Sequence, residues 1–319
     1  EIASIGSYTN ALLITDEKFN ILSKIKLLKT EQEFKTKAFA IHRAVLHNIL
    51  INKLDGVKIH LNKKLKSLSQ TDNEVIFDFE DGTTYTSNIL IGADGIHSVV
   101  RKTIIGNTEL RIAKQVCWRG IVKTDISNKY ETELNELWGK GKRFGFVKIN
   151  KKEVYWYALA NYKMDYKVEF GNANLEELFS NFSPLVKQII SKTEKRNIIF
   201  NEMMDLKPIS SWHNKNVCLI GDASHATTPN LGQGACQAIE TAFVIAECLS
   251  TENNINLAFQ KLEKIRKKNV EKVINTSWTV GKTAHLDNRA AIFFRNNIMK
   301  LMPKTITEKQ STSIYKLNY

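Results

Sequence analysis

One stretch of the chain, Gly221–Cys236, constrains the fold more than any other. It follows a short apolar run, Val217–Gly221, typical of a buried parallel strand, and it leads into a helical pattern over Gly234–Leu249. Gly232 and Gly234 have no Cβ, so the backbone there can approach a ligand closely. Because the helix begins at once, its first amides and its positive dipole end face that ligand. The stretch therefore predicts an α/β fold with a site for an anionic or electron-rich group.

A second stretch, Gly92–Arg101, also follows a short apolar run. Asp94 and Gly95 predict a tight turn, and Arg101 supplies a cation close to the strand end. Earlier in the chain, Arg43 lies on a predicted helix, and its guanidinium can bind a phosphate or a carboxylate. Taken singly, the Gly92–Arg101 stretch is equally well explained as a tight turn with a surface arginine, and Arg43 is better explained as a solvated arginine on an amphipathic helix. Their order along one chain is what favours a shared function.

The order of the predicted elements indicates one α/β domain interrupted by a second domain. The chain has 319 residues, enough for about two domains. We predict that residues 1–107 and 212–319 form the first domain and residues 108–211 the antiparallel-sheet domain. The predicted strands are Val57–Leu61, Lys64–Ser69, Val75–Phe79, Asn88–Gly92, Gln115–Lys123, Arg143–Ile149, Val154–Ala160 and Val217–Gly221, with a hairpin turn at Asp81-Gly82. The predicted helices are Lys37–Leu54, Asn174–Phe182, Ser183–Ser191, Gly234–Leu249, Leu257–His285 and Asn288–Met302.

Composition and charge exclude several classes of protein. Hydrophobic residues make up 43% of the chain, which excludes a mostly disordered protein. No apolar run reaches about 18 residues, so no integral membrane segment is expected. The net charge of +13 comes from lysines spread along the whole chain, without an arginine-rich stripe, so we expect no nucleic-acid partner. The four cysteines lack metal-site spacing, and we expect reduced, buried thiols in a cytoplasmic protein that holds no metal.

Together these stretches resemble the class A flavoprotein monooxygenases. This aromatic-hydroxylase family includes salicylate-, 3-hydroxybenzoate- and urate-hydroxylase-like enzymes and zeaxanthin epoxidase. Gly92–Arg101 resembles the Asp-Gly motif of the family, and Gly221–Cys236 resembles its Gly-Asp motif with the following Pro-x-x-Gly-Gln-Gly. Trp118-Arg119-Gly120 resembles a strand of the family's substrate domain. The resemblance extends from about Ala38 to Ser277.

The resemblance implies a Rossmann-like FAD-binding domain of the glutathione-reductase type. An antiparallel-sheet substrate domain would interrupt this FAD-binding domain in sequence, and helices would form the C-terminal part of the chain. It also implies FAD as cofactor, NADH or NADPH as co-substrate, and O2 and a small aromatic molecule as substrates. The cofactor-binding residues that it implies are Arg43, Leu65, Asp94, Gly95, Arg101, Gly221, Asp222, Gly232, Gln233, Gly234 and Ala235.

The resemblance also implies roles for these residues. The amides of Gly232–Gly234 would face the pyrimidine edge of the flavin and favour its reduction. Asp222 would bind the ribityl chain or the pyrophosphate, and Arg43 the ribityl-phosphate region. Asp94 and Arg101 would order the pyrophosphate side and the approach of the nicotinamide.

Fewer residues are implied for the chemistry itself. Pro229 would shape the cavity beside the flavin and exclude water. His225 is a candidate general base, and its alternative role is a structural hydrogen bond. The candidates for the substrate pocket are Arg119, Tyr155 and Tyr157.

One motif of the family is absent from this sequence. The Gly-x-Gly-x-x-Gly turn that holds the ADP half of FAD is not found. Its nearest match, Gly139–Gly145, precedes a strand and predicts a hairpin loop. Relative to the family, roughly 60 to 70 residues are missing before Glu1. A smaller departure is Glu240-Thr241, where the family has Glu-Asp.

Three alternatives remain open from the sequence. A serine hydrolase built from Asp222, Ser224 and His225 is opposed by their near-contiguity, since a triad converges from separate elements. A truncated, non-catalytic remnant with weak FAD binding is expected if the chain begins at Glu1, because strand edges would lie unpaired. A related isoprenoid epoxidase or reductase would share the same motifs. The substrate, the choice between NADH and NADPH, and a homodimeric assembly stay open as well.

Overall fold

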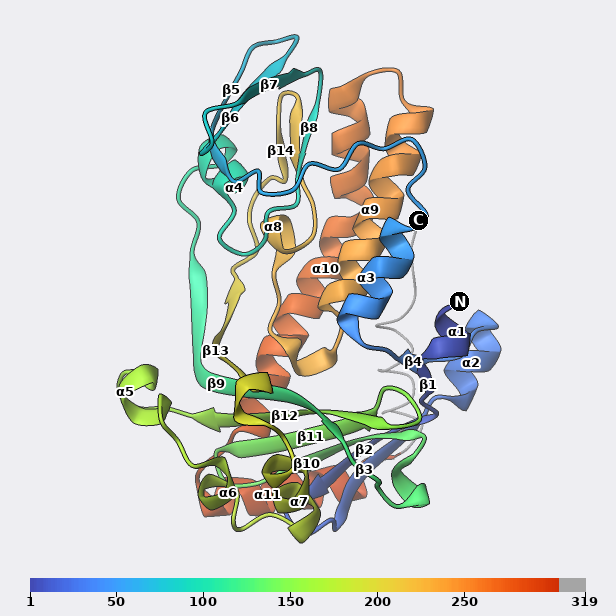
Figure 1. Ribbon diagram of the computed structural model, residues 1–319, viewed down its shortest axis with the longest axis vertical. Helices are drawn as coiled ribbons and strands as arrows, with labels where there is room; N and C mark the ends of the chain where they lie inside the picture. Colours follow the sequence, from blue (N-terminus) through green and yellow to red (C-terminus); the bar gives the residue numbers. More distant parts are fainter. Residues whose placement is uncertain (304–319) are drawn as a thin grey trace. The chain divides into compact units, whose positions relative to one another are not determined.

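The computed structural model describes residues 1–303, which form two compact units (Figure 1). The first unit contains residues 1–57, 114–203 and 282–303, and the second contains residues 58–113 and 204–281. The division predicted from the sequence, with boundaries after residues 107 and 211, stays a prediction; it groups residues 1–57 with the α/β part. Three elements run from one unit into the other: β9 (Leu110–Lys123), β13 (Ile199–Leu206) and α10 (Ile255–Ala284).

The first unit is built on a seven-stranded sheet with the order β13-β9-β12-β11-β10-β2-β3. β9 pairs antiparallel with β12, β12 with β11, and β11 with β10, and β2 pairs antiparallel with β3, whereas β10 and β2 run parallel. The strands predicted over 115–123, 143–149 and 154–160 are confirmed, and residues 139–141 form the predicted hairpin loop. The further strands of this sheet are β2 (Ala11–Asp16), β3 (Ile21–Lys26), β10 (Glu133–Trp138), β11 (Lys142–Lys148) and β12 (Glu153–Asn161).

One face of this sheet packs on an apolar core. Phe144 and Phe146 of β11 and Trp156 of β12 are fully buried in it, at alternate positions as the strand period requires. The helices that contribute side chains to this core are α5 (Tyr166–Phe170), α6 (Leu175–Leu178) and α7 (Pro184–Ser191). The other elements of the unit are α1 (Ile2–Ile5), β1 (Ser7–Tyr8), α2 (Leu28–Phe34), β4 (Phe39–Ala40), α3 (Arg43–Ile51), α11 (Arg289–Leu301) and the 3-10 helices η1 (Asn128–Tyr130) and η2 (Lys195–Asn197).

The second unit contains two three-stranded sheets, β14-β15-β8 and β5-β6-β7. β15 runs parallel to β8, as the two short apolar runs predict, and the predicted turn at Asp81-Gly82 joins the antiparallel strands β6 and β7. The strands are β5 (Leu65–Gln70), β6 (Val75–Phe79), β7 (Thr84–Ser87), β8 (Leu90–Gly92), β14 (His213–Asn214) and β15 (Val217–Leu219). The helices are α4 (Val99–Ile104), α8 (Asp222–His225), α9 (Gly234–Thr251) and the 3-10 helix η3 (Pro229–Leu231).

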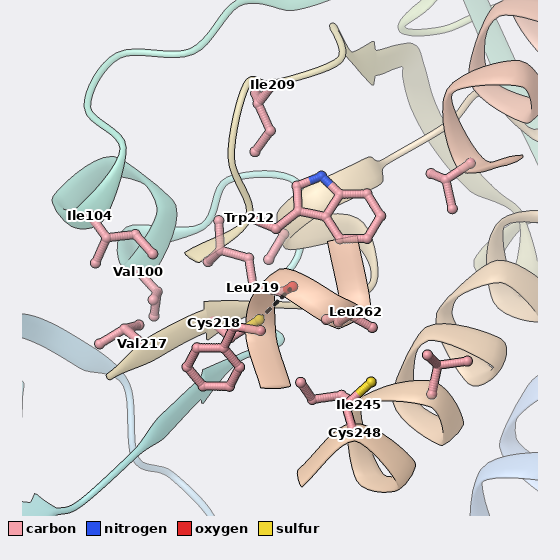
Figure 2. Close-up of a cluster of buried hydrophobic side chains, with 14 of the residues drawn as sticks. Val100, Ile104, Ile209, Trp212, Val217, Cys218, Leu219, Ile245, Cys248 and Leu262 are labelled. Carbon is pink, nitrogen blue, oxygen red and sulfur yellow. Dashed lines mark hydrogen bonds between the residues drawn. The ribbon is translucent and has the colours of Figure 1, made fainter. Parts of the chain in front are cut away.

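A buried apolar cluster joins the elements of the second unit (Figure 2). β15 contributes Cys218 and Leu219, both fully buried, and Trp212 is 2% exposed in the same cluster. Cys248 comes from α9 and Leu262 from α10. Burial of this kind provides about 1.5 to 3 kcal/mol for each large apolar side chain. The cluster therefore fixes the end of β15, where the Gly221 stretch begins.

Two local predictions are wrong. Val57–Leu61 forms no strand, and its apolar side chains are exposed, because no strand among residues 1–303 pairs with it. Cys236 was expected to be buried but is exposed, since it lies on the outer side of the first turn of α9. Two predicted helices are also shorter: the one over 37–54 is limited to α3, because Phe39–Ala40 forms β4, and the one over 174–182 ends with α6 at Leu178. The remaining cysteines are buried thiols, as predicted: Cys117, Cys218 and Cys248.

Candidate functional site

The chain turns sharply after β15 ends. Gly221 has φ +59° and ψ −144°, a combination that only glycine adopts readily. Its carbonyl accepts hydrogen bonds from the amides of Ser224 and His225, at 3.0 and 2.9 Å, which closes the single turn of α8. Asp222 begins that turn, and its side chain is exposed. The predicted strand-end turn is therefore present, with a carboxylate at its surface.

A second turn follows at residues 229–236, which we call the amide turn. Pro229–Leu231 forms a short 3-10 helix, and Gly232 ends it in the left-handed conformation with φ +65°. No atom of the described chain lies within 4 Å of the place that a Cβ would take at Gly232. α9 begins at Gly234, and no side chain among residues 1–303 caps its N-terminus. The amide turn therefore offers backbone N–H groups and a positive dipole end to an anionic ligand.

The burial of the side chains in the amide turn also indicates that its backbone groups are what a ligand would contact. Gln233 is only 5% exposed, whereas Pro229 and Ala235 are exposed. The one polar side chain between the two glycines is thus withdrawn into the protein, and the exposed residues of the turn are a proline, a glycine, an alanine and a cysteine. A flat apolar ring with a polar edge is complementary to such a surface.

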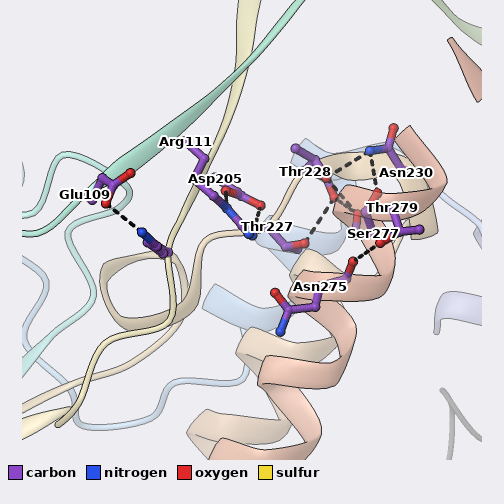
Figure 3. A network of polar contacts seen from close by, with 10 residues as sticks. Glu109, Arg111, Asp205, Thr227, Thr228, Asn230, Asn275, Ser277 and Thr279 are labelled. Carbon is purple, nitrogen blue, oxygen red and sulfur yellow. Dashed lines mark hydrogen bonds and ion pairs between the residues drawn. The ribbon is translucent and has the colours of Figure 1, made fainter. Parts of the chain in front are cut away.

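A polar network lies behind the amide turn (Figure 3). Thr228 and Asn230 form hydrogen bonds with Ser277 of α10. Beside them, Arg111 donates two hydrogen bonds to Asp205, at 2.8 and 2.9 Å. Burial raises the pKa of Asp205 above its usual value despite this cation. Sequence reasoning missed this network, because its members come from four distant segments and no local spacing connects them.

The Gly92–Arg101 stretch also takes the predicted turn, but its charged groups bind protein atoms. Asp94 accepts hydrogen bonds of 2.5 and 3.1 Å from a hydroxyl and an amide at the start of α4. Arg101 is 4% exposed and donates to the carbonyl of Ala223 at 2.8 Å, which ties α4 to α8. Gly95 has φ +84° and open space where its Cβ would lie. The exposed Asp94 therefore stabilises the start of α4, and the buried Arg101 links α4 to α8.

Arg43 and Leu65 lie in different units. Arg43 is exposed at the first position of α3, in the first unit. Leu65 begins β5 in the second unit and packs, partly buried, against the apolar cluster. Their roles toward a cofactor stay predictions.

His225 is held inside the second unit. Its side chain is 3% exposed, and Nε2 lies 3.0 Å from Oγ1 of Thr241. Burial lowers the pKa of His225 to about 4, so the imidazole is neutral at neutral pH. Its ring centroid lies 5.2 Å from that of Trp212. These contacts favour the structural hydrogen bond over general-base catalysis.

Two neighbouring strands of the first unit bring the predicted substrate residues onto one face of the sheet. Tyr157 of β12 pairs with Arg119 of β9, and Tyr155 lies two positions along β12. Nη2 of Arg119 donates to Asn201 at 2.7 Å, while its buried Nε has no hydrogen-bond partner among residues 1–303. Burial raises the pKa of Tyr155 to about 12, so its hydroxyl is a stable hydrogen-bond donor at neutral pH.

Glu136 lies at the centre of the same face. Its carboxylate accepts hydrogen bonds from the Tyr157 hydroxyl and from Nε1 of Trp138, both at 2.8 Å, and lies 3.0 Å from Nη1 of Arg143. A Cβ on Gly145 would stand 2.0 Å from the Tyr157 ring, so glycine is required opposite that ring. We call these residues the polar sheet face: Arg119, Glu136, Trp138, Arg143, Gly145, Tyr155 and Tyr157.

The residues around Glu136 were missed because β10 was not predicted. A partial signal was present, because a hairpin loop was predicted over Gly139–Gly145. The structure narrows this loop to 139–141, which pairs Trp138 with Arg143 and places Glu136 opposite Gly145. Only with the narrower loop does extending the hairpin by two residues on each side bring the acid and the arginine together.

Within the described chain, no group of three or more His, Cys, Asp or Glu side chains is placed to hold a metal ion. In residues 1–303, every helix is either too short or too polar to cross a membrane.

The second unit fits a flavin dinucleotide. Gly95 and Gly232 both have positive φ and open space in place of a Cβ, so a ring or a phosphate can approach the backbone. An exposed carboxylate, Asp222, follows the parallel strand and can accept hydrogen bonds from hydroxyl groups. The uncapped N-terminus of α9 supplies the positive end of a dipole. A parallel strand, a glycine turn and an open helix N-terminus are together typical of the dinucleotide-binding class of proteins.

Comparison with known proteins agrees with this class. Residues 26–255 match the family described as "FAD binding domain". The chain is 32% identical to 2-heptyl-3-hydroxy-4(1H)-quinolone synthase of Pseudomonas aeruginosa over 276 residues, which is 83% of this chain and 69% of that protein. It is 29% identical to aurachin C monooxygenase/isomerase of Stigmatella aurantiaca over 304 residues, 94% of this chain and 79% of that protein.

The fold is similar to that of Klebsiella pneumoniae HpxO, solved in complex with FAD and uric acid. The TM-score is 0.88 at 21% identity, over 97% of this chain and 80% of that chain. The chain belongs to the FAD binding domain family of flavoprotein monooxygenases. The resemblance noted from the sequence, the fold class and the FAD cofactor are therefore confirmed.

Proposed function

We propose that the protein uses NADH or NADPH and O2 to hydroxylate a small aromatic or heteroaromatic ring. The observation that carries this proposal is the amide turn, an exposed glycine turn at the uncapped start of an 18-residue helix. The names of its relatives, a monooxygenase/isomerase and a hydroxyquinolone synthase, support oxygen transfer to a ring. When bound, FAD supplies the redox chemistry, accepting a hydride from the nicotinamide and activating O2.

The residues of the amide turn would hold the flavin and bias its charge. Backbone N–H groups of Gly232, Gln233, Gly234 and Ala235 favour a negative charge beside them, and the reduced flavin is anionic. Pro229 is exposed next to these groups and would exclude water from the reacting side. The protein thus contributes position and electrostatics.

The remaining cofactor residues would act around that turn. Gly221 and Gly95 give the dinucleotide close access to the backbone, and Asp222 accepts hydrogen bonds from its hydroxyl groups. Asp94 and Arg101 act indirectly, because their side chains bind protein atoms of the two strand-end turns. The residues proposed to contact the outer parts of the cofactor are Arg43 and Leu65.

The polar sheet face would orient the substrate. The Tyr155 hydroxyl is protonated at neutral pH, and Arg119 is a cation with no carboxylate within ion-pair distance among the described residues. Both groups donate hydrogen bonds to oxygen. Tyr157 is engaged by Glu136 and offers the side of its ring. The face therefore suits a ring that bears a carbonyl or enolate oxygen, a feature shared by the quinolone and the uric acid named for the similar proteins.

A single experiment tests this function. The purified protein is examined for flavin absorbance near about 450 nm, and NADH and NADPH oxidation is then followed with 4-quinolones, oxopurines and phenolic acids. We expect one class of ring to stimulate oxidation and to gain one oxygen atom derived from O2. Oxidation without an oxygenated product for any ring would contradict the proposal, and a colourless protein would favour the non-catalytic remnant. A cytoplasmic location and a homodimer stay predictions.

A further inference from the structure

α10 contacts the segment that contains the amide turn on both of its sides. On the N-terminal side, Oγ of Ser277 donates to the carbonyl of Thr228 at 2.6 Å and lies 2.9 Å from its Oγ1. Nδ2 of Asn230 donates to the carbonyl of Ser277 at 2.9 Å and to Oγ1 of Thr228 at the same distance (Figure 3). Ser277 is fully buried and Thr228 is 2% exposed. The entry to the turn is therefore fixed by a small, water-shielded network.

Gly281, one helical turn after Ser277, leaves room for this arrangement. A Cβ at Gly281 would stand 2.4 Å from Nδ2 of Asn230. Glycine inside a helix is unfavourable relative to alanine, so its position here has a packing reason. The Asn230 side chain lies in the space that the missing Cβ leaves open.

On the C-terminal side, Arg266 of α10 binds two residues of α9. Its Nη2 donates to Oε1 of Gln237 at 2.7 Å and lies 2.7 Å from Oε2 of Glu240. Arg266 is fully buried and Gln237 is 1% exposed. The first turns of α9, just after the amide turn, therefore bind α10, which is also the helix that binds the residues at the start of the turn.

We propose that α10 sets the position of the amide turn, with Ser277 and Arg266 as positioning residues that act through Asn230 and Gln237. The turn itself has two glycines, and its N-cap residue Gln233 makes no capping hydrogen bond, so its position depends on the contact of Asn230 with α10. Groups that act on a ligand need support that fixes them within about 0.5 Å. This inference rests on the proposed placement of FAD at the turn.

The test compares FAD affinity and flavin potential in single variants. Ser277→Ala removes a buried hydroxyl with two hydrogen bonds, and we expect FAD to dissociate about tenfold more readily, the equivalent of one such bond. The midpoint potential of bound FAD becomes more negative, because the amides no longer lie against the flavin edge. Ser250→Ala is the matched control, since Ser250 is exposed on α9 and bonds only to a carbonyl of its own helix. It leaves both quantities unchanged.

A double-mutant cycle tests the contact itself. Gly281→Ala displaces Asn230 and weakens FAD binding, whereas Gly281→Ala adds no further loss in an Asn230→Ala background. Thermal unfolding of each flavin-loaded variant separates loss of position from loss of fold. A Ser277→Ala protein with unchanged affinity and potential overturns the inference, and so does a fully additive cycle.

Gly232→Val separates this inference from the proposed function. If Gly232→Val weakens FAD binding while Ser277→Ala does not, the turn holds the flavin but α10 does not position it. If neither substitution changes FAD binding, the flavin is not at the turn, and the placement falls as well.

Discussion

The amide turn and the polar sheet face present opposite kinds of surface. In the amide turn the exposed polar chemistry is mainly backbone: the exposed residues are a proline, a glycine, an alanine and a cysteine, and the Asn230 side chain binds the network behind them. On the polar sheet face the chemistry is side chain: a carboxylate, two arginines and two tyrosines on adjacent strands. The backbone N–H and C=O groups of those strands form the hydrogen bonds between neighbouring strands.

This difference explains what each region can recognise. A backbone turn supplies donors that do not depend on side-chain identity, so it suits a cofactor that every member of a family shares. A face made of side chains changes with each substitution, so it suits a substrate that differs between relatives. In the proposed function, cofactor binding and substrate selection are therefore built from different parts of the chain.

Glu136→Ala is expected to have the largest effect and to act on the polar sheet face alone. It removes an acceptor for Tyr157 and Trp138 and the carboxylate beside the buried Arg143. Breaking a buried ion pair from one side costs about 3 to 5 kcal/mol, and we expect a loss of that size in urea denaturation. Glu194→Ala breaks an exposed pair and is expected to cost at most about 1 kcal/mol. Equal losses in the two variants would contradict a buried cluster.

The pH dependence of stability tests the interior behind the amide turn. The pKa of His225 is lowered by burial to about 4, against about 6.5 for an exposed histidine. The unfolded chain therefore binds more protons between these values, and stability is lost as the pH falls from about 6.5 toward 4, by about 3 kcal/mol in total. His225→Gln removes this part of the dependence, whereas His97→Gln, at an exposed site, leaves it. Unfolding curves measured from pH 4 to 7 give the slopes, and an unchanged slope in His225→Gln would show that the imidazole is not buried as a neutral group.

Gly145→Ala separates the two regions by function. Its Cβ would stand 2.0 Å from the Tyr157 ring, and overpacking of this kind costs about 1 to 3 kcal/mol. We expect poorer coupling of NAD(P)H oxidation to product formation, with FAD affinity unchanged, because the substitution moves only the sheet face. In the Tyr157→Ala background, where the ring is absent, we expect Gly145→Ala to lower the free energy of unfolding by less than it does when Tyr157 is present. A weakened FAD affinity in Gly145→Ala would break the separation of roles.

The same contrast explains how far the sequence alone predicts this protein. Gly232 and Gly234 were identified because glycine lets the backbone approach a ligand; Gly232 has positive φ, whereas Gly234 begins α9 without it. The short strands β8 and β15 and the long helix α9 could also be predicted, because apolar runs and helical periodicity are local signals in the sequence. Glu136 was missed because the residues that it contacts depend on the register in which β10 pairs with β11.

Other parts of the site required tertiary structure. Ser277 reads as an ordinary polar residue in a helical pattern, and only the fold places it against Thr228. Arg101 reads as a surface cation, but the fold buries it and binds it to a carbonyl of α8. β2 was missed in part because one of its two partners in the sheet is β10, more than a hundred residues away in sequence, whereas its other partner, β3, is its neighbour along the chain. Local patterns carry no information about such partners.

The smallest expected effect distinguishes two substitutions at one glycine of the amide turn. Gly232 has φ +65° and ψ 17°, the left-handed conformation, which asparagine tolerates and a β-branched residue does not. We expect Gly232→Val to weaken FAD binding about tenfold and Gly232→Asn by at most about threefold, since strain in this region costs about 1 to 2 kcal/mol. Fluorescence titration of the apoprotein with FAD measures both. Because the space around the missing Cβ is open, steric exclusion within the protein does not explain a difference. Equal losses in the two variants would instead mean that any side chain here collides with the flavin, so that the turn discriminates by close approach and not by backbone conformation.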